Sequence, residues 1–297
     1  NHIISYGLGD WFDIGPKSPG ESQLTSNGVT ATAIYYYDVT LMEKMANLLG
    51  KPDDACKYQD LAAQIKQAFN QTFWNPSTRT YDRNSQAANA VALYMELTTS
   101  ENRQQVFDNL IADIRRRNNA LTAGDVGYRY VLRALEAGGA SDVIYDMNCK
   151  YDTPGYGWQL AHGATALTES WQAYGFVSNN HFMLGHLMEW LFSGLGGIRQ
   201  KEDSFGFKHI VIKPEPVGDV RDAQVSYKSP YGQIVSDWKD NDKEFIIRVE
   251  VPANSKASIY LPAADTKQIT ESGVRLEDVP GISCKQEGNR YVVATTG

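Results

Sequence analysis

Cysteine is scarce in this sequence, and long apolar runs are missing. The three cysteines, Cys56, Cys149 and Cys284, lie far apart, and no CxxC or Cys/His cluster occurs. Neither a zinc site nor a disulfide framework is therefore indicated, although one disulfide among the three stays open. No uninterrupted apolar run approaches the roughly 20 residues that span a bilayer. We expect no bound metal, no cofactor and no membrane partner.

Positive charge is also in short supply. The 297 residues carry 28 Lys and Arg against 35 Asp and Glu, a formal net charge of −7. This balance argues against nucleic acid or an anionic membrane surface as the main partner. The sequence contains no GxSxG elbow, no glycine-rich phosphate loop and no HExxH, so the common signatures of serine hydrolases, nucleotide-binding proteins and zinc proteases are absent.

Apolar residues recur at helical spacing from residue 26 to about 195, and no convincing strand interrupts them. Helices with one polar face, such as 100–117, alternate with small-residue or apolar ones, such as 86–97 and 180–195. In a simple bundle nearly every helix would show a polar face. The alternation therefore predicts a toroid of helical hairpins. The remaining predicted helices start at 27, near 61, near 125 and near 140 and end near 48, 74, 137 and 148.

The pattern changes after the glycine-rich segment 194–197. From Lys208 onward, short segments alternate with period two and are separated by turns, as at 229–232. This predicts a small antiparallel β-sandwich of roughly 90–100 residues. The length allows two domains, which we place at 1–198 (helical) and 199–297 (β-sandwich).

One carboxylate has surroundings that suit sugar chemistry. Glu169 lies among small residues and hydroxyls, beside Trp171 and shortly before Asn180 and His181. A carboxylate to activate water, an aromatic face for a ring, and amide and imidazole groups for hydroxyls are what hydrolysis of a glycosidic bond requires. The alternative is that Glu169 favours the first turn of a helix, where negative charge meets the helix dipole.

Three further groups are candidates for binding sugar. Asp10 and Trp11 precede the first helix, where they could bind hydroxyls and stack on a ring, or cap a turn and fill the core. His181 is expected at the start of the 180–195 helix, where the dipole disfavours its charged form. Tyr156 and Trp158 are expected in a loop upstream of Glu169, either lining a sugar subsite or plugging the structure.

A series of short motifs, in order along nearly the whole chain, resembles the bacterial α-L-rhamnosidases of glycoside hydrolase family 78. No motif is highly specific by itself, but their ordered series is. The motifs are Gly-Asp-Trp at 9–11, Ser-Gln-Ala-Ala-Asn-Ala at 85–90, Thr-Ala-Gly at 122–124 with Val-Gly at 126–127, Pro-Gly-Tyr-Gly-Trp at 154–158, Gly-Ala-Thr at 163–165 with Thr-Glu-Ser-Trp at 168–171, and Asn-His at 180–181.

This resemblance implies a mainly α fold: part of an (α/α)₆ toroid, roughly eight of its twelve helices, followed by the β-sandwich. It also implies hydrolysis of terminal α-L-rhamnose from glycosides or polysaccharides with inversion. Glu169 matches the family's general base and His181 a rhamnose-contacting histidine. Trp11, with Asp10 beside it, matches an aromatic wall. Tyr81 and Tyr156 lie near positions of sugar-facing aromatics, although a tryptophan is expected at the position of Tyr156.

The family's general acid precedes the Gly-Asp-Trp motif, and this sequence begins, without Met, too late to contain it. We therefore expect that a segment upstream supplies the acid and that the chain alone is nearly inactive. The alternatives are another toroid glycosidase, of the trehalase or glucoamylase kind, and a non-catalytic carbohydrate-binding protein. Oligomeric state and compartment do not follow from the sequence, with a periplasmic or extracellular place preferred.

Overall fold

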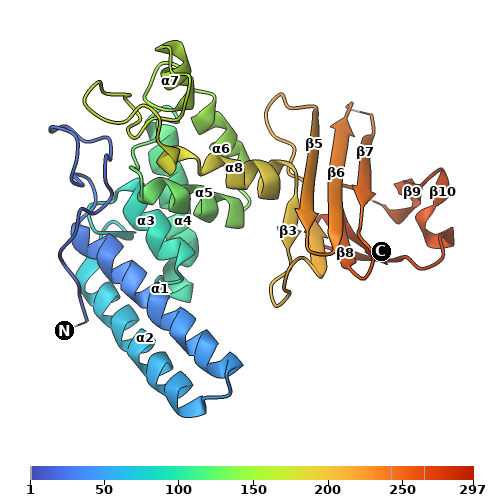
Figure 1. The fold of residues 1–297 in the computed structure, drawn as a ribbon, viewed down its shortest axis with the longest axis horizontal. Helices are drawn as coiled ribbons and strands as arrows, with labels where there is room; N and C mark the ends of the chain where they lie inside the picture. Colours follow the sequence, from blue (N-terminus) through green and yellow to red (C-terminus); the bar gives the residue numbers. More distant parts are fainter. Residues whose placement is uncertain (1, 242, 264) are drawn as a thin grey trace. The chain divides into compact units, whose positions relative to one another are not determined.

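The computed structural model describes residues 2–241, 243–263 and 265–297. The chain divides into two compact units, Asn1–Leu187 and Met188–Gly297. The first unit is helical, and the second consists mainly of strands (Figure 1). The fold class predicted from the sequence, helices followed by a β-sandwich, is therefore confirmed. The domain boundary at residue 198 stays a prediction.

The first unit is a set of helices joined mostly by short connections. The long helices α1 and α2 form an antiparallel hairpin that Figure 1 shows in blue, and α3 packs against α4 and α5. Their bounds are α1 (Asn27–Leu48), α2 (Pro52–Phe73), α3 (Gln86–Tyr94), α4 (Ser100–Arg116), α5 (Gly127–Ala137), α6 (Ser141–Asn148) and α7 (Tyr156–Ala161).

The predicted alternation of inner and outer helices is present. In α3 every residue from Gln86 to Leu93 is buried, whereas α4 buries only one stripe that includes Val106, Leu110 and Ile114. The Ser85 hydroxyl caps α3 by accepting a hydrogen bond from the Ala88 N–H at 3.0 Å. A helix buried on all faces needs small side chains if neighbours are to pack closely around it, and α3 supplies four alanines.

Two short strands occupy a region where we predicted none. β1 (Trp74–Asn75) and β2 (Thr80–Tyr81) pair as a tight hairpin after α2. The Asn75 side chain organises the turn by accepting from the backbone and hydroxyl of Ser77. The buried Asn89 amide holds β2 in place, because its Oδ1 accepts from the Tyr81 N–H at 2.9 Å. Pairings of only two residues leave no periodicity to detect in the sequence.

The predicted helix at 180–195 is wrong as a single element. It is replaced by a 3₁₀ turn (Phe182–Leu184), α8 (Leu187–Trp190) and a π-helical turn (Leu191–Leu195). The π turn leaves room for an indole against a glycine: a Cβ on Gly194 would lie 2.3 Å from Nε1 of Trp190.

The loop predicted around Tyr156 is helical instead, as α7. A close approach to the preceding backbone explains why α7 can form only with glycine at its second position. A Cβ on Gly157 would lie 2.2 Å from the Lys150 carbonyl oxygen. α3 is also shorter than predicted. It ends at Tyr94 rather than Leu97, because Glu96 adopts a left-handed φ of 57°.

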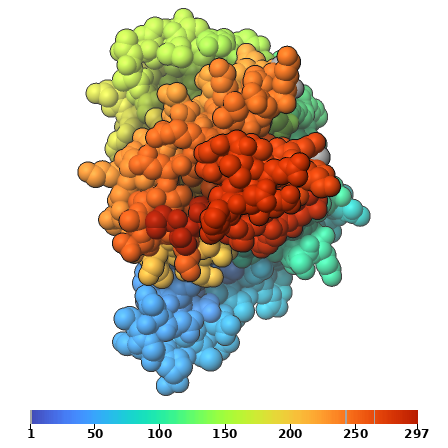
Figure 2. All heavy atoms as spheres, turned by 90° about the vertical axis from the view of Figure 1, so that its right-hand side faces the viewer, coloured from blue at the N-terminus to red at the C-terminus, as the bar shows by residue number. Residues whose placement is uncertain are grey.

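The second unit packs a five-stranded sheet against a three-stranded one. Its core contains Ile198, Ile210, Ile212, Ile234 and Ala257. Figure 2 shows the surface of this unit in orange and red. The five-stranded sheet has the order β11 (Ser283–Glu287), β12 (Arg290–Thr296), β8 (Lys256–Leu261), β4 (His209–Ile212) and β3 (Ile198–Gln200). The three-stranded sheet has the order β5 (Asp222–Ser229), β6 (Gly232–Asp240) and β7 (Phe245–Glu250).

One strand pair departs from the antiparallel sandwich that we predicted. β4 and β8 are parallel, with His209 opposite Lys256 and Ile212 opposite Ile259, whereas the other pairs within the two sheets are antiparallel. A parallel pair needs a long crossover connection, and here β5, β6 and β7 lie between the two strands. A small separate hairpin joins β9 (Thr270–Glu271) to β10 (Val274–Arg275).

Cys56, Cys149 and Cys284 are free and exposed. Among the described helices, none combines the length and the apolar character that a membrane crossing requires.

Two isoleucines of the second unit form a matched test of its core. Ile234 on β6 is fully buried, whereas Ile246 on β7 is 51% exposed. We expect Ile234→Ala to lower the free energy of unfolding by about 2–5 kcal/mol and Ile246→Ala to change it by less than about 0.5 kcal/mol. Urea unfolding followed by tryptophan fluorescence measures both, since Trp238 lies in the same unit. Equal effects would contradict this core.

Candidate active site

The loop before α1 is fastened to the start of α5 by one buried carboxylate. Asp10 is fully buried. Its Oδ2 accepts a hydrogen bond from the Gly124 N–H at 2.9 Å, and its Oδ1 accepts one from the Gly127 N–H at 2.6 Å. The N–H groups at the start of a helix have no partner within the helix, and a carboxylate also suits the helix dipole. Asp10 thus joins two segments far apart in sequence.

Close packing requires both of the glycines that Asp10 binds. We call Asp10 and these two glycines the Asp10 clamp. A Cβ on Gly124 would lie 2.1 Å from the Trp11 carbonyl oxygen. One on Gly127 would lie 2.4 Å from the Ala87 Cβ and 2.6 Å from Asp10 Oδ2. Distances this short exclude any larger side chain unless the backbone moves.

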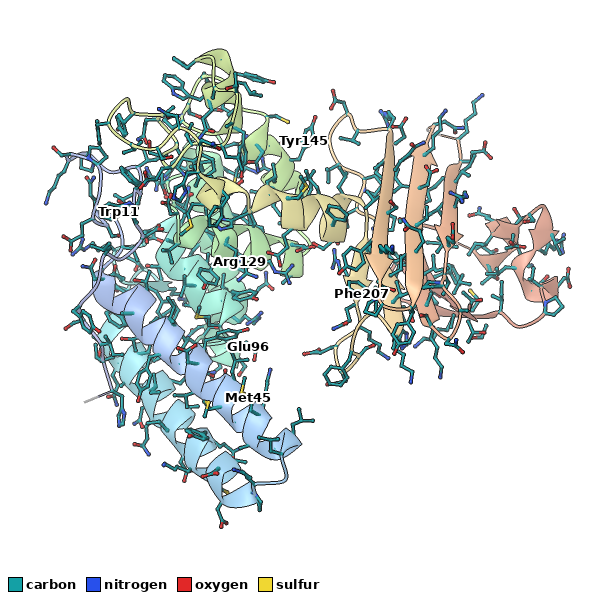
Figure 3. All side chains as sticks on the ribbon, in the orientation of Figure 1. Trp11, Met45, Glu96, Arg129, Tyr145 and Phe207 are labelled. Atoms are coloured by element: carbon teal, nitrogen blue, oxygen red, sulfur yellow. The ribbon has the colours of Figure 1, made fainter. Side chains whose placement is uncertain are left out.

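Trp11 lies next to the clamp and is only half-buried, as Figure 3 shows for the N-terminal loop. Its carbonyl oxygen accepts from the Asp125 N–H at 2.8 Å. Its indole meets the Phe12 ring edge-on, with centroids 5.1 Å apart. Phe12 has a left-handed φ of 58°, which is unusual for a bulky residue and typical of functional sites. The strained turn fixes the direction of the indole.

Trp171 connects the Glu169 segment to the Asp10 clamp. Its ring is fully buried, and its Nε1–H donates to the Ala123 carbonyl oxygen at 2.9 Å. Tyr128 and Tyr156 pack edge-on against it, with centroids 4.8 and 5.1 Å away. Trp171 therefore positions the segment from within the core. Its predicted contact with sugar stays a prediction that this burial does not favour.

Glu169 lies on a loop segment that is bonded to a second loop segment around Ser178, and not at the helix start that we expected. We call this pair of segments the Glu169 clamp. Its N–H donates to the Ser178 carbonyl oxygen at 2.9 Å, and its Oε2 accepts from the Ser178 N–H at 3.1 Å. The His181 N–H donates to the Leu167 carbonyl oxygen at 2.8 Å. The side chain is half-buried, and Oε1 has no hydrogen bond to a described residue. One oxygen is thus fixed and the other is available.

His181 lies on the Glu169 clamp, and one of its ring nitrogens accepts a hydrogen bond. Its Nδ1 accepts from the Met183 N–H at 3.2 Å, so the proton of the neutral ring is on Nε2. That N–H can donate to a hydroxyl. Because only a three-residue 3₁₀ turn follows, the long-helix dipole that we expected to act on His181 is not present.

Asp125 is a site residue that sequence reasoning missed. It is 3% exposed, and its Oδ1 contacts no hydrogen-bond partner among the described residues. Burial first, and then the charges of Asp10 and Glu169, raise the pKa of Asp125 to about 8. Its position inside the Thr-Ala-Gly-Asp-Val-Gly motif was the available signal, because the flanking residues had been singled out. An unpartnered buried carboxyl beside a candidate base is typical of functional sites.

Asp10 is engaged inside the protein. Both of its oxygens are bonded to backbone N–H groups and none of its surface is exposed, so its predicted contact with a sugar hydroxyl stays a prediction that this burial does not favour. Burial raises its pKa to about 7, although the N–H groups of Gly124 and Gly127 oppose the rise. Asp10 is a structural carboxyl.

The two predicted sugar-facing tyrosines are also engaged inside the protein. Tyr81 is fully buried and donates its hydroxyl to Asn70 Oδ1 at 2.6 Å. Tyr156 donates its hydroxyl to the Leu184 carbonyl oxygen. Their role toward sugar stays a prediction. The structure instead links Asp125 to Trp11 through a backbone hydrogen bond and to Glu169 through its charge, and it places Glu169 and His181 on one pair of loop segments. Within the described residues, no group of His, Cys, Asp and Glu is arranged to hold a metal ion.

Comparison with known proteins places this arrangement in a class and then in a family. Residues 1–195 match the family described as the bacterial alpha-L-rhamnosidase 6 hairpin glycosidase domain, which defines the class as glycosidases built from helical hairpins. Residues 197–275 match the bacterial alpha-L-rhamnosidase C-terminal domain. The chain belongs to the bacterial α-L-rhamnosidase family.

Solved structures agree over the whole chain. The α-L-rhamnosidase from Dictyoglumus thermophilum is 30% identical with a TM-score of 0.89, covering 100% of this chain and 34% of that one. The Streptomyces avermitilis α-L-rhamnosidase, solved in complex with L-rhamnose, is 25% identical with a TM-score of 0.83, covering 100% of this chain and 28% of that one.

Curated relatives are similar over most of this chain. An alpha-L-rhamnosidase of Streptomyces avermitilis is 29% identical over 284 residues, covering 92% of this chain and 26% of the relative. One from Formosa agariphila is 26% identical over 278 residues, covering 91% and 30%. The chain thus spans between a quarter and a third of the relatives that it matches.

The Asp10 clamp can be tested at its glycines. Gly127→Ala would place a methyl group against Ala87 and Asp10, whereas Gly175→Ala would meet open space. We expect the first change to lower the free energy of unfolding by about 1–3 kcal/mol and the second to stay within about 0.5 kcal/mol. Thermal and urea unfolding measure both. A Gly127→Ala variant as stable as wild type would rule out the close packing.

The buried carboxyls predict a pH-dependent stability. Asp10 and Asp125 have folded-state pKa values of about 7 and about 8, above the ordinary 3.8. Their contribution to stability is therefore greatest below pH 4 and is lost as the pH rises towards 8. We expect Asp125→Asn to gain stability over wild type as the pH rises from 5 to 8, by at most about 1.4 kcal/mol per pH unit.

Differential unfolding at pH 5, 6, 7 and 8 checks this expectation. Asp108→Asn on the exposed side of α4 serves as the control, because an exposed aspartate should give a flat difference. A flat difference for Asp125→Asn as well would show that Asp125 ionises normally in the folded protein.

Proposed function

We propose that the protein to which this chain belongs hydrolyses terminal α-L-rhamnosides, with Glu169 as the general base. The observation that carries this proposal is the Glu169 clamp, in which Ser178 fixes one carboxylate oxygen and the other is free. The printed names of the relatives, all alpha-L-rhamnosidases, and the L-rhamnose in one neighbouring structure support the choice of sugar.

The chemistry assigned to Glu169 is the activation of water. Oε1 takes a proton from the water as the water oxygen forms its bond to the anomeric carbon. The bond from that carbon to the leaving oxygen breaks on the opposite face, and the leaving oxygen takes up a proton from a general acid. Attack opposite the leaving group inverts the anomeric configuration. We assign the acid to a segment of the relatives that this chain does not span.

Asp125 and Glu169 lie in different environments. Burial keeps Asp125 uncharged near neutral pH, so it adds no second negative charge beside Glu169. Because Asp125 is only 3% exposed and its Oδ1 is buried, we assign it no direct contact with substrate and propose that it shapes the surroundings of Glu169.

His181 and Trp11 complete the proposed sugar site. The Nε2–H of His181 is oriented by the Met183 N–H bond at Nδ1, and it donates to a ring hydroxyl. Trp11, half-buried beside the strained Phe12, offers an indole face to the apolar side of the ring. Both contacts hold the sugar while Glu169 acts on water.

Replacement of the base is the direct test. In a protein that spans the full length of the relatives, we expect Glu169→Gln to lower kcat on an aryl α-L-rhamnoside by about 10²–10⁴-fold. Glu101→Gln, on the exposed start of α4, is the control and should keep full activity. NMR of the first product formed reports the anomeric configuration.

Three outcomes would contradict parts of the proposal. Retention of configuration would exclude the inverting mechanism. Full activity of Glu169→Gln would exclude the base. A protein that binds rhamnose but cleaves no member of an aryl glycoside panel would be a carbohydrate-binding protein and not a hydrolase.

A further inference from the structure

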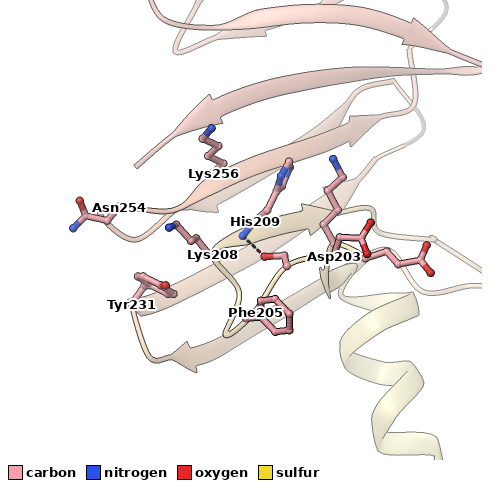
Figure 4. A pocket seen from close by; sticks show the side chains of 10 residues that line it. Asp203, Phe205, Lys208, His209, Tyr231, Asn254 and Lys256 are labelled. Atoms are coloured by element: carbon pink, nitrogen blue, oxygen red, sulfur yellow. Dashed lines mark hydrogen bonds between the residues drawn. The ribbon is translucent and has the colours of Figure 1, made fainter. Parts of the chain in front are cut away.

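A groove in the second unit lies at the loops between strands and shares no residue with the proposed active site. It has a volume of about 530 Å³, which is in the range of small-ligand sites. Three segments form it: the β3–β4 loop, the β5–β6 turn with Tyr231, and the segment around Asn254 before β8. Figure 4 shows Lys208, Lys256, Tyr231 and Phe205 grouped around His209.

Three lysines line this groove. They are Lys201, Lys208 and Lys256, and none of them forms a salt bridge with a residue that the structure describes. Two carboxylates, Glu202 and Asp203, also line the groove, so the balance is positive in a protein of net charge −7. An anionic group would meet this excess of positive charge, which makes it the natural ligand.

The surroundings of the groove shift the pKa of His209, which lies at its floor. Burial, followed by the charges of Lys201 and Lys256, lowers the pKa of His209. The imidazole is therefore neutral near pH 7, and its Nε2 shares a hydrogen bond with the Ser258 hydroxyl at 3.0 Å. The floor of the groove is thus polar, while its positive charge is supplied by lysines.

Two aromatic rings at the groove face solvent. Phe205 is 77% exposed and Tyr231 is 40% exposed. An exposed phenylalanine has no part in the core of the second unit, which contains neither ring. Flat apolar faces beside charged groups suit a sugar ring, whose C–H face is apolar and whose substituents are polar.

The groove is built by ordered turns. The Ser204 Oγ accepts from the His209 N–H at 2.8 Å, the bond drawn dashed in Figure 4. The Gln200 Oε1 accepts from the Phe207 N–H at 2.9 Å. Phe207 and Asn254 have left-handed φ values of 65° and 63°. Such strained residues concentrate where a loop must present side chains in a fixed direction.

We propose that this groove binds a carboxylate-bearing carbohydrate, a uronate unit, with Lys208 and Lys256 on the carboxylate and Tyr231 and Phe205 on the sugar ring. Charge-assisted hydrogen bonds from ammonium to carboxylate supply the selectivity for an acidic sugar. The inference rests on the proposed function in one respect, namely that the ligand is a carbohydrate. It makes the second unit a substrate-holding part of the protein.

The first measurement is calorimetric titration of the chain with an oligogalacturonate, alongside its fully methyl-esterified form. The two probes share a sugar backbone and differ in charge. We expect the acidic probe to bind, more weakly as salt is raised, and the esterified probe to bind at least tenfold more weakly. Equal affinity for both probes, or no binding of either at millimolar concentration, would overturn the proposal.

Matched variants locate the binding. The double variant Lys208→Gln/Lys256→Gln should weaken oligogalacturonate binding at least tenfold, and Tyr231→Ala should weaken it several-fold. The control is Lys228→Gln/Lys239→Gln, which removes the same charge from exposed positions on β5 and β6 outside the groove. We expect the control to stay within twofold of wild type. Equal losses in both double variants would reduce the effect to net charge.

Two further arms separate this proposal from its alternatives. A single-stranded oligonucleotide that competes as well as the uronate would show an unspecific polyanion surface and overturn the proposal. Glu169→Gln should leave uronate binding unchanged, while the lysine variants should leave hydrolysis of a neutral aryl rhamnoside unchanged. Failure of the groove and failure of the proposed hydrolase are thus read from different assays. Thermal unfolding of each variant verifies that the fold is retained.

Discussion

The bond between the buried Asp10 carboxyl and the start of α5 is the constraint on which the helical unit's site depends. The two acceptor oxygens hold Gly124 and Gly127, and the backbone between them carries Asp125 against Trp11. The residue before the clamp, Ala123, receives the Trp171 indole. Three segments from the beginning, middle and end of the first unit therefore meet at one short stretch of backbone.

Three carboxyl groups share this small volume and have three different tasks. Asp10 is saturated with backbone donors and serves the fold. Asp125 is buried without a partner for one oxygen, and Glu169 keeps one oxygen free on a half-buried side chain. Glu169 is the most accessible of the three, which agrees with its assignment as a base.

The parts of the fold that followed from the sequence are those with long, regular patterns. α1 and α4 were predicted within a residue or two, because their apolar positions repeat over several turns. The break at 180–195 was not, since an apolar composition fits one helix as well as three short turns. Site residues divide in the same way. Glu169 and His181 lie together on one clamp, whereas Tyr81 and Trp171 lie in the core, because an aromatic side chain gives no sign of which way it faces. Asp125 escaped notice because burial, rather than residue type, makes it unusual.

The parallel pairing of β4 with β8 has a consequence for the order in which the second unit is completed. Register sets His209 beside Lys256, yet the whole β5–β6–β7 sheet lies between them in the chain. Loop closure of this kind is slow and comes late in folding. The lysine-lined groove therefore exists only after the last crossover has closed. A nascent or truncated chain that ends before β8 would display Phe205 and Lys208 without Lys256, which completes the groove.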